Sequence, residues 1–222
     1  MLSQAEQERI SAAIAAAEAN TSGEIFCIYE RRIEDSGDAT RLLWSAALAL
    51  LAPPLLVLAQ IALVDPWSAG VAAGRAQELE FLGLYTLVQA GVFGATYAAL
   101  SLRGLRRLAT PRAAKRARAH RAALQAFLAR GLHLTRDRTG VLIFVVEEDH
   151  QIEVVADEGI HSKVDPGVWG EAVAALANGL RRRDAAGGFE AAIAQCGAVL
   201  AQHFPPRPDD ANELPNRIIV VD

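Results

Sequence analysis

The sequence predicts a small α/β sandwich with a mixed sheet, interrupted by a two-helix transmembrane hairpin. Two long runs without a charged residue predict the hairpin, and short strand-like runs that alternate with amphipathic helical stretches predict the sandwich. Of the 222 residues, 52% are hydrophobic. Much of this excess lies in the two uncharged runs, while the rest of the chain mixes charged and apolar residues as a water-soluble domain does.

The uncharged runs cover residues 42–64 and 81–102. Each exceeds the roughly 20 apolar residues that cross the hydrocarbon core of a bilayer. The alternative is a pair of buried helices in a soluble core, but such helices seldom remain uncharged for about six turns. We therefore expect a transmembrane hairpin over residues 42–102, with Pro53 and Pro54 kinking its first helix.

Basic residues flank the hairpin on both outer sides and are nearly absent from the connection between its two runs. Residues 65–80 contain Arg75 as their only basic residue. Because positively charged flanks stay on the cytoplasmic side, a multi-pass protein of the inner (cytoplasmic) membrane with both termini in the cytoplasm is expected. An N-terminus without a signal-peptide pattern agrees with this orientation. The flanking cations are Arg31, Arg32, Arg41, Arg103, Arg106, Arg107, Arg112, Lys115, Arg116 and Arg118.

The segment before the hairpin, residues 1–35, predicts one helix and one strand. Ser3 and Glu6 have capping-box spacing at the start of the helix, and Glu24–Glu30 has the aromatic and β-branched content of a strand. No partner for this strand precedes the hairpin. Its partners must therefore come from residues 110–222, which makes the hairpin an insertion into a split domain.

Residues 110–222 predict the remainder of the sandwich. The pattern indicates a helix that begins at Pro111, a β-hairpin, two further helices and a short final strand. The expected strands are 141–146, 151–156 and 218–221, with one helix after Asp165 and a second after the pair Gly187 and Gly188.

Several expectations concern partners and packing. The net charge of −4, with arginines clustered beside the apolar runs, predicts no nucleic-acid partner, and the lipid bilayer is the expected one. The basic start of the helix after Pro111 either contacts anionic headgroups or is simply solvated. Cys27 and Cys196 are expected to be buried reduced thiols. A small-residue face on the second run, formed by Ala90, Gly94 and Ala98, is expected to pack against its neighbour.

Taken together, these segments resemble the TPM domain family, named for a thylakoid lumen phosphatase, a photosystem II repair protein and a levamisole-receptor modulator. The resemblance covers roughly residues 3–30 and 120–205. It is closer to a bacterial subgroup with a membrane hairpin after the first strand. The motifs that carry it are Thr21-Ser22-Gly23-Glu24-Ile25, Asp137-Arg138-Thr139-Gly140-Val141-Leu142-Ile143-Phe144-Val145, Ala156-Asp157-Glu158-Gly159-Ile160 and Asn212-Glu213-Leu214-Pro215-Asn216.

The resemblance implies an α/β sandwich and one of two roles, membrane-protein maintenance or phosphatase chemistry. The sequence departs from the family in two ways. Many relatives place the domain outside the cytoplasm behind a signal peptide, whereas the charges here place it inside. Asp157 and Glu158 also stand where more glycine is usual.

Loop carboxylates are the candidate site. Asp137, Asp157 and Asp165 are expected near strand or helix ends, where they would bind a divalent cation, calcium or magnesium, if they converge. A turn residue and a helix cap are the simpler interpretations of Asp137 and Asp165. His161 and Lys163 would offer acid/base or phosphate contacts beside them. A run of three cations, Arg181 to Arg183, either grips an anionic partner or closes a helix where cations suit the dipole.

Two function classes follow. The first is a non-catalytic membrane-tethered module that binds or maintains other membrane proteins. The second is a metal-dependent acid phosphatase acting on phosphomonoesters. No GxSxG elbow, Walker loop or HExxH motif is present, so the sequence leaves open whether the chain is an enzyme.

Overall fold

The computed structural model describes residues 2–33, 38–58, 75–209 and 212–221. The chain divides into two compact units. The first unit joins Met1–Glu34 to Arg112–Asp222, and the second unit is Asp35–Pro111. Each unit is described by itself below.

A four-stranded mixed sheet forms the centre of the first unit, with strand order β3-β2-β1-β4. Strand β1 (Glu24–Glu30) pairs in parallel with β2 (Gly140–Val146) and with β4 (Ile218–Val221). Strand β3 (Gln151–Ala156) pairs antiparallel with β2. The predicted strands and the mixed sheet are confirmed, and both partners of β1 come from beyond residue 110.

Both central strands are covered on both faces. In β1, Ile25, Cys27 and Tyr29 enter one hydrophobic core, while Phe26 and Ile28 enter the other. This is the side-chain alternation of a strand, and it explains why β1 and β2 read as nearly continuous apolar runs. Cys27 and Cys196 are buried free thiols, as expected.

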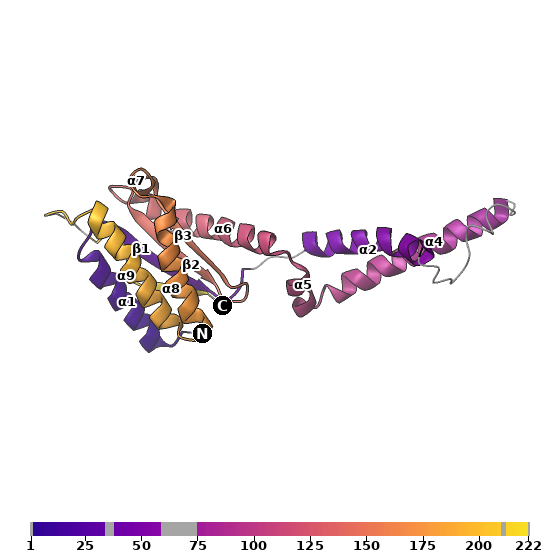
Figure 1. Cartoon of the computed structure of the whole chain (residues 1–222), viewed down its shortest axis with the longest axis horizontal. Helices are drawn as coiled ribbons and strands as arrows, with labels where there is room; N and C mark the ends of the chain where they lie inside the picture. The colour runs from indigo at the N-terminus through magenta and orange to yellow at the C-terminus, as the bar shows by residue number, and fades with distance from the viewer. Residues whose placement is uncertain (1, 34–37, 59–74, 210–211, 222) are drawn as a thin grey trace. The chain divides into compact units, whose positions relative to one another are not determined.

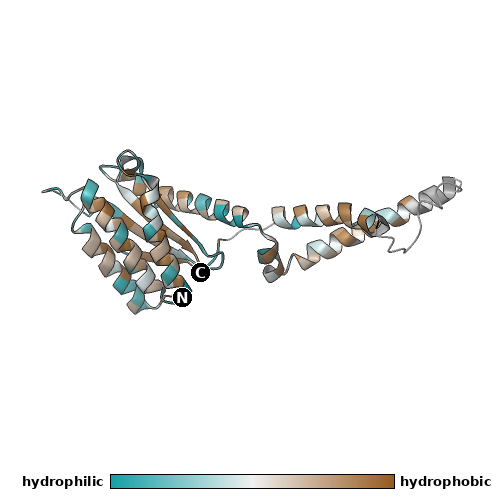
Figure 2. Cartoon of the chain, in the orientation of Figure 1, coloured by the Kyte–Doolittle hydropathy of each residue, from teal (hydrophilic) through white to brown (hydrophobic). Residues whose placement is uncertain are grey.

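Three helices cover one face of the sheet: α1 (Gln4–Glu18), α8 (Trp169–Arg181) and α9 (Ala185–His203). Figure 1 shows α1, α9 and α8 side by side over the strands, and Figure 2 shows polar and apolar residues mixed along each of them. Their buried apolar residues belong to the core on this face of the sheet. The capping box of Ser3 and Glu6 begins α1, as predicted. The largest fully buried side chains of this layer are Ile10, Ile14, Leu176, Phe189, Ile193 and Leu200.

The opposite face of the sheet is covered by α6 (Arg112–Ala129) and the short η1 (Leu132–Leu134). Ala119, Ala123 and Phe127 of α6 pack against Phe26, Phe144 and other members of the second core. Two short elements, α7 (Glu158–His161) and η2 (Pro166–Val168), connect β3 to α8. The first unit is therefore a helix–sheet–helix sandwich.

The start of α9 differs from the prediction. Gly187 and Gly188 do not precede the helix but lie in its first turn, because Asp184 is the N-cap and accepts a hydrogen bond from the Gly187 amide at 2.9 Å. Their role is close packing. A Cβ on Gly188 would lie 3.1 Å from the Gly179 Cα, and a Cβ on Gly179 would lie 2.4 Å from the Gly188 Cα, so α8 and α9 meet there through bare backbone.

The second unit contains α2 (Asp38–Leu58), α4 (Arg75–Ala99) and α5 (Arg103–Ala109). Helices α2 and α4 pack along each other. Ser45 and Ala49 are small buried residues of α2. At one end, the Arg41 guanidinium lies 5.3 Å from the centroid of the Tyr97 ring, and the Trp44 indole nitrogen donates to the Ala109 carbonyl at 3.0 Å.

The sequence made two predictions for this unit, a transmembrane hairpin and a packing face on its second helix. Within the described residues, no helix combines the length and apolarity that crossing a membrane requires, so a transmembrane hairpin is not found. Residues 59–64 of the first predicted run lie outside the described residues. The packing expectation for Ala90, Gly94 and Ala98 is wrong: all three are exposed, since Phe93 and Tyr97 stack on a different side of α4.

Candidate functional site

Asp157, one of the three predicted site residues, is buried and held by an arginine. Its carboxylate is only 4% exposed. The Arg138 guanidinium donates to both carboxylate oxygens, at 2.9 to 3.1 Å, and the Glu158 amide donates to Oδ1 at 2.7 Å. This ion pair raises the pKa of Arg138 above its ordinary value. The carboxylate is thus bound by its own protein on both oxygens.

The loop around Asp157 is built to make this pair. Asp157 is the N-cap of α7, and its amide donates to the Gly140 carbonyl at 2.9 Å. A Cβ on Gly159 would lie 2.4 Å from the Asp137 carbonyl oxygen, so only glycine lets the loop approach the turn before β2. Arg138 itself has φ 57°, which turns its side chain back toward Asp157.

The other two predicted carboxylates serve different local roles. Asp137 forms an ion pair with Arg207, from the segment after α9. Asp165 accepts a hydrogen bond from the Gly167 amide at 2.7 Å and caps η2. Among the described residues, no group of three or more His, Cys, Asp or Glu side chains is arranged to hold a metal ion. Each of the three carboxylates has a protein partner, which is Arg138, Arg207 or the Gly167 amide. A calcium or magnesium site at these residues stays a prediction.

Neither of the two basic candidates joins these carboxylates. His161 is exposed in the last turn of α7. The ammonium nitrogen of Lys163 lies 4.7 Å from the centroid of the Phe204 ring, which is a cation–π contact with a member of the first core. Their positions are explained by loop structure.

A pocket of about 310 Å³ lies instead where α8 and α9 meet. Its lining is Ala175, Asn178, Gly179, Arg182, Asp184, Gly187, Gly188 and Ala191. Gly179 and Gly188, where the backbones of the two helices meet, are both part of this lining. Asn178, Arg182 and Asp184 are exposed at its rim.

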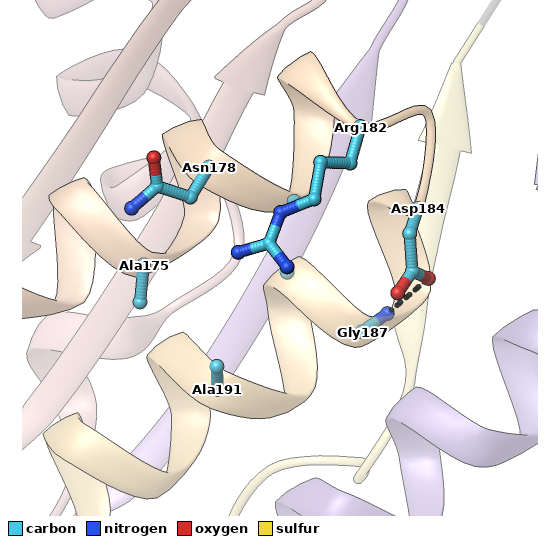
Figure 3. Close-up of a pocket in the computed structure, with 8 residues that line it drawn as sticks. Ala175, Asn178, Arg182, Asp184, Gly187 and Ala191 are labelled. Carbon is cyan, nitrogen blue, oxygen red and sulfur yellow. Dashed lines mark hydrogen bonds between the residues drawn. The ribbon is translucent and has the colours of Figure 1, made fainter.

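The polar groups of this pocket have distinct tasks (Figure 3). Asp184 points back to its own helix and accepts from the Gly187 amide. The side-chain oxygen of Asn178 accepts from Arg181, so its amide nitrogen remains available as a donor. Figure 3 draws one hydrogen bond among the lining residues, from Gly187 to Asp184, and the Arg182 guanidinium extends over the pocket without one.

The sequence offered two roles for Arg181 to Arg183, a grip on an anionic partner or the end of a helix. Arg181 does lie in the last turn of α8, but Arg182 belongs to the pocket. Arg183 has φ 61° and turns the chain toward Asp184. The sequence does contain a pattern that could have indicated this pocket. Arginines followed by an aspartate cap and two glycines predict a tight turn between two helices with a cation beside it.

A second group of residues that the sequence did not single out lies beside the start of β1. The buried Glu24 carboxylate accepts from the amides of Glu213, at 3.0 Å, and Leu214, at 3.2 Å. Glu18 accepts from the Ile25 amide at 2.8 Å, whereas its Oε2 atom is buried without a hydrogen bond. Two motifs that are distant in sequence, at residues 21–25 and 212–216, are joined here.

Burial changes the protonation of Glu18. Desolvation, with a smaller contribution from the Glu24 charge, raises the pKa of the Glu18 carboxyl from 4.5 to about 8. Glu18 is therefore mostly protonated at neutral pH. We interpret this group as the attachment point of the C-terminal segment, because all its described contacts go to backbone or to that segment.

Comparison with protein families gives one match. The model of the TPM domain matches residues 107–199, from the end of α5 through most of α9. This range contains Asp137, Asp157, Asp165 and the entire pocket between α8 and α9. The matched range ends before residues 212–216 and begins after β1. No curated protein matches the chain significantly.

One solved structure has a similar fold. The NMR structure of the BA42 protein from the psychrophilic bacterium Bizionia argentinensis aligns with a TM-score of 0.58 and 20% sequence identity. The alignment covers 99% of this chain and 95% of that one. At this identity the likeness concerns the fold alone.

Proposed function

Residues 107–199 carry a TPM domain, and from this premise we propose that the chain is a membrane-anchored interaction module rather than a metal-dependent hydrolase. In this proposal the second unit, Asp35–Pro111, inserts into a bilayer. The first unit, which contains the TPM domain, binds other membrane proteins or assists their maintenance.

The observation that carries the anchor is the exposed leucine surface of the second unit. Leu43 is 65% exposed, Leu50 is 65% exposed and Leu87 is 71% exposed. Burying one leucine side chain is worth about 1.5 to 3 kcal/mol, so leaving many of them in water is unfavourable. Hydrocarbon is a solvent that would remove this cost. Leu42, Leu48, Leu51, Leu55, Leu82 and Leu84 add to the same surface.

The flanking charges support an orientation for the proposed anchor. Basic residues precede α2 and follow α4, and residues 65–80 between the two runs have Arg75 alone. On the positive-inside principle, both termini and the entire first unit then face the cytoplasm of an inner membrane.

The geometry of the carboxylates favours interaction over hydrolysis. A cation-binding aspartate needs free oxygen lone pairs, and both Asp157 oxygens are taken by Arg138. The pocket between α8 and α9 offers a guanidinium and an amide, which are recognition groups. We therefore place the function of the first unit in binding.

Membrane fractionation of the full chain tests the anchor. We expect the protein to remain in the bacterial membrane pellet after an alkaline carbonate wash and to dissolve only with detergent. Recovery of the full chain in the carbonate supernatant would contradict the proposal. Reporter enzymes fused after Asp222 test the orientation. We expect a reporter that works only in the cytoplasm to be active and one that works only in the periplasm to be inactive.

In-cell cross-linking tests the interaction role. The full chain should give reproducible adducts with other membrane proteins. Finding monomers alone, in membranes where the protein is present and folded, would argue against an interaction module. Hydrolysis of a phosphomonoester with calcium, magnesium or manganese present would favour the phosphatase alternative instead.

A further inference from the structure

We propose that the pocket between α8 and α9 binds a terminal carboxylate attached to a small apolar group, such as the C-terminal residue of a polypeptide. This inference gives the proposed interaction module its ligand and rests on that proposal. Asp137, Asp157 and Asp165 take no part in it, whereas Arg182 belongs to the three cations that the sequence offered to an anionic partner. The inference is argued from the residues that line the pocket.

The donors of the pocket match a carboxylate. The Arg182 guanidinium extends over the pocket, and Figure 3 draws no bond from it to another lining residue. Guanidinium groups bind carboxylates through two parallel N–H bonds. The Asn178 amide nitrogen supplies a further donor, because Arg181 occupies the oxygen of the same amide.

The one acidic group at the pocket does not oppose an anion strongly. Asp184 accepts from the Gly187 amide at the start of α9, so its charge faces the positive end of that helix. Glu190, its ion-pair partner, and to a smaller extent Asp184 raise the pKa of Arg9, so the Arg9–Glu190 pair lies within electrostatic reach of Asp184. Three arginines, Arg181 to Arg183, precede Asp184, so the local charge remains positive.

The walls and the size restrict the rest of the ligand. Ala175 and Ala191 line the pocket with methyl groups, and Gly179 and Gly188 line it with bare backbone. A volume of about 310 Å³ is near the lower end of the range for small-molecule sites. One small apolar residue with its carboxylate fits within this space.

Titration of the detergent-solubilised full chain with three probes tests the inference. The probes are N-acetyl-alanine, a hexapeptide that ends in alanine, and the same hexapeptide with an amidated C-terminus. Binding is followed by calorimetry and by NMR shifts of the Asn178 side-chain amide. We expect the free-acid hexapeptide to bind and the amidated form to bind at least about tenfold more weakly, as loss of a charge-assisted contact predicts.

Matched variants separate the pocket from general charge. Arg182→Met should weaken free-acid binding at least about tenfold, and Arg182→Lys should fall between Met and the parent because it keeps charge without the planar fork. Arg183→Met removes the same charge one residue away, outside the lining, and should change binding less than about twofold. Both positions are exposed, so circular dichroism should show unchanged folding.

Each outcome decides the inference. It is supported if the amide and the Arg182→Met variant each weaken binding at least about tenfold while Arg183→Met leaves it nearly unchanged. Preference for the hexapeptide over N-acetyl-alanine then points to a protein tail, and equal binding points to a free small acid. The inference is overturned if neither acid binds, if the amide binds equally, or if Arg182 and Arg183 variants behave alike. Carbonate washing of the same variants tests the anchor separately, because neither arginine belongs to the second unit.

Discussion

The two units of the chain treat their apolar side chains in opposite ways. In the first unit, Phe189, Ile143 and Leu176 are fully buried between the sheet and its helices. In the second unit, Leu50 and Leu87 are more than 60% exposed although they belong to well-formed helices. Figure 2 shows apolar residues along both units. The difference shows that a helix can form without burying its apolar side chains. The helices of the second unit are well formed, but the unit's own residues do not cover their leucines.

The largest expected effect is the loss of stability when a cavity is made in the core of the first unit. Phe189→Ala removes a fully buried ring that contacts Tyr29 edge-on, with ring centroids 6.2 Å apart. We expect the free energy of unfolding of the first unit to fall by about 3 to 5 kcal/mol. Urea unfolding of the detergent-solubilised full chain, followed by tryptophan fluorescence, measures it. Leu87→Ala is the control and should change this transition by less than about 0.5 kcal/mol.

A charge in place of an exposed leucine tests whether the leucine surface has a hydrocarbon partner. Leu87 is 71% exposed in α4, and Leu134 is 74% exposed in the first unit. Arginine at the centre of a membrane helix costs about 2.5 to 3.5 kcal/mol, so Leu87→Arg should shift protein from the washed membrane pellet to the soluble fraction. Leu134→Arg should leave the distribution unchanged. Equal behaviour of the two variants would remove the distinction between the units.

Asp157→Asn distinguishes a structural carboxylate from a catalytic one. The change weakens the paired bonds from Arg138 at a position that is 4% exposed, and we expect a loss of roughly 1 to 3 kcal/mol in unfolding free energy. Arg138→Met should lower stability similarly, because it removes the other half of the pair. A variant with unchanged thermal stability but abolished phosphomonoester hydrolysis would assign Asp157 to catalysis instead.

The last prediction concerns pH. Glu18 has its pKa raised from 4.5 to about 8 in the folded protein, so the folded state holds a proton that the unfolded state has lost. Stability from this group is therefore present below about pH 4.5 and declines as pH rises toward 8. Glu18→Gln should flatten the dependence of melting temperature on pH between those values. An unchanged slope would show that other groups set it.

The sequence was sufficient to predict the sandwich because its elements are locally encoded. The strand Glu24–Glu30 and the strand at 151–156 have the predicted bounds, and the Ser3 capping box is present. The start of α9 was misplaced. Glycine usually ends or interrupts a helix, but here Gly179 and Gly188 are required by the contact between two helices, which no local pattern reveals.

The candidate site was harder to predict, since convergence depends on tertiary geometry. Asp137, Asp157 and Asp165 have the right residue type near one another in sequence, yet Arg138 and Arg207 bind two of them and a helix start binds the third. Arg207 lies 70 positions from Asp137 in sequence, so this pairing has no local signature. The pocket likewise depends on how α8 and α9 approach each other.

The parallel pairing of β1 with β2 has a consequence for biosynthesis. Glu24 lies opposite Gly140, and the entire second unit is translated between them. At ribosomal speed the first strand waits on the order of ten seconds for its neighbour to emerge. During that interval Ile25 and Phe26 have no neighbouring strand to pair with, because both partners of β1 come later in the chain. Assembly of the sheet is thus a late event, completed only after every residue of the insertion has left the ribosome.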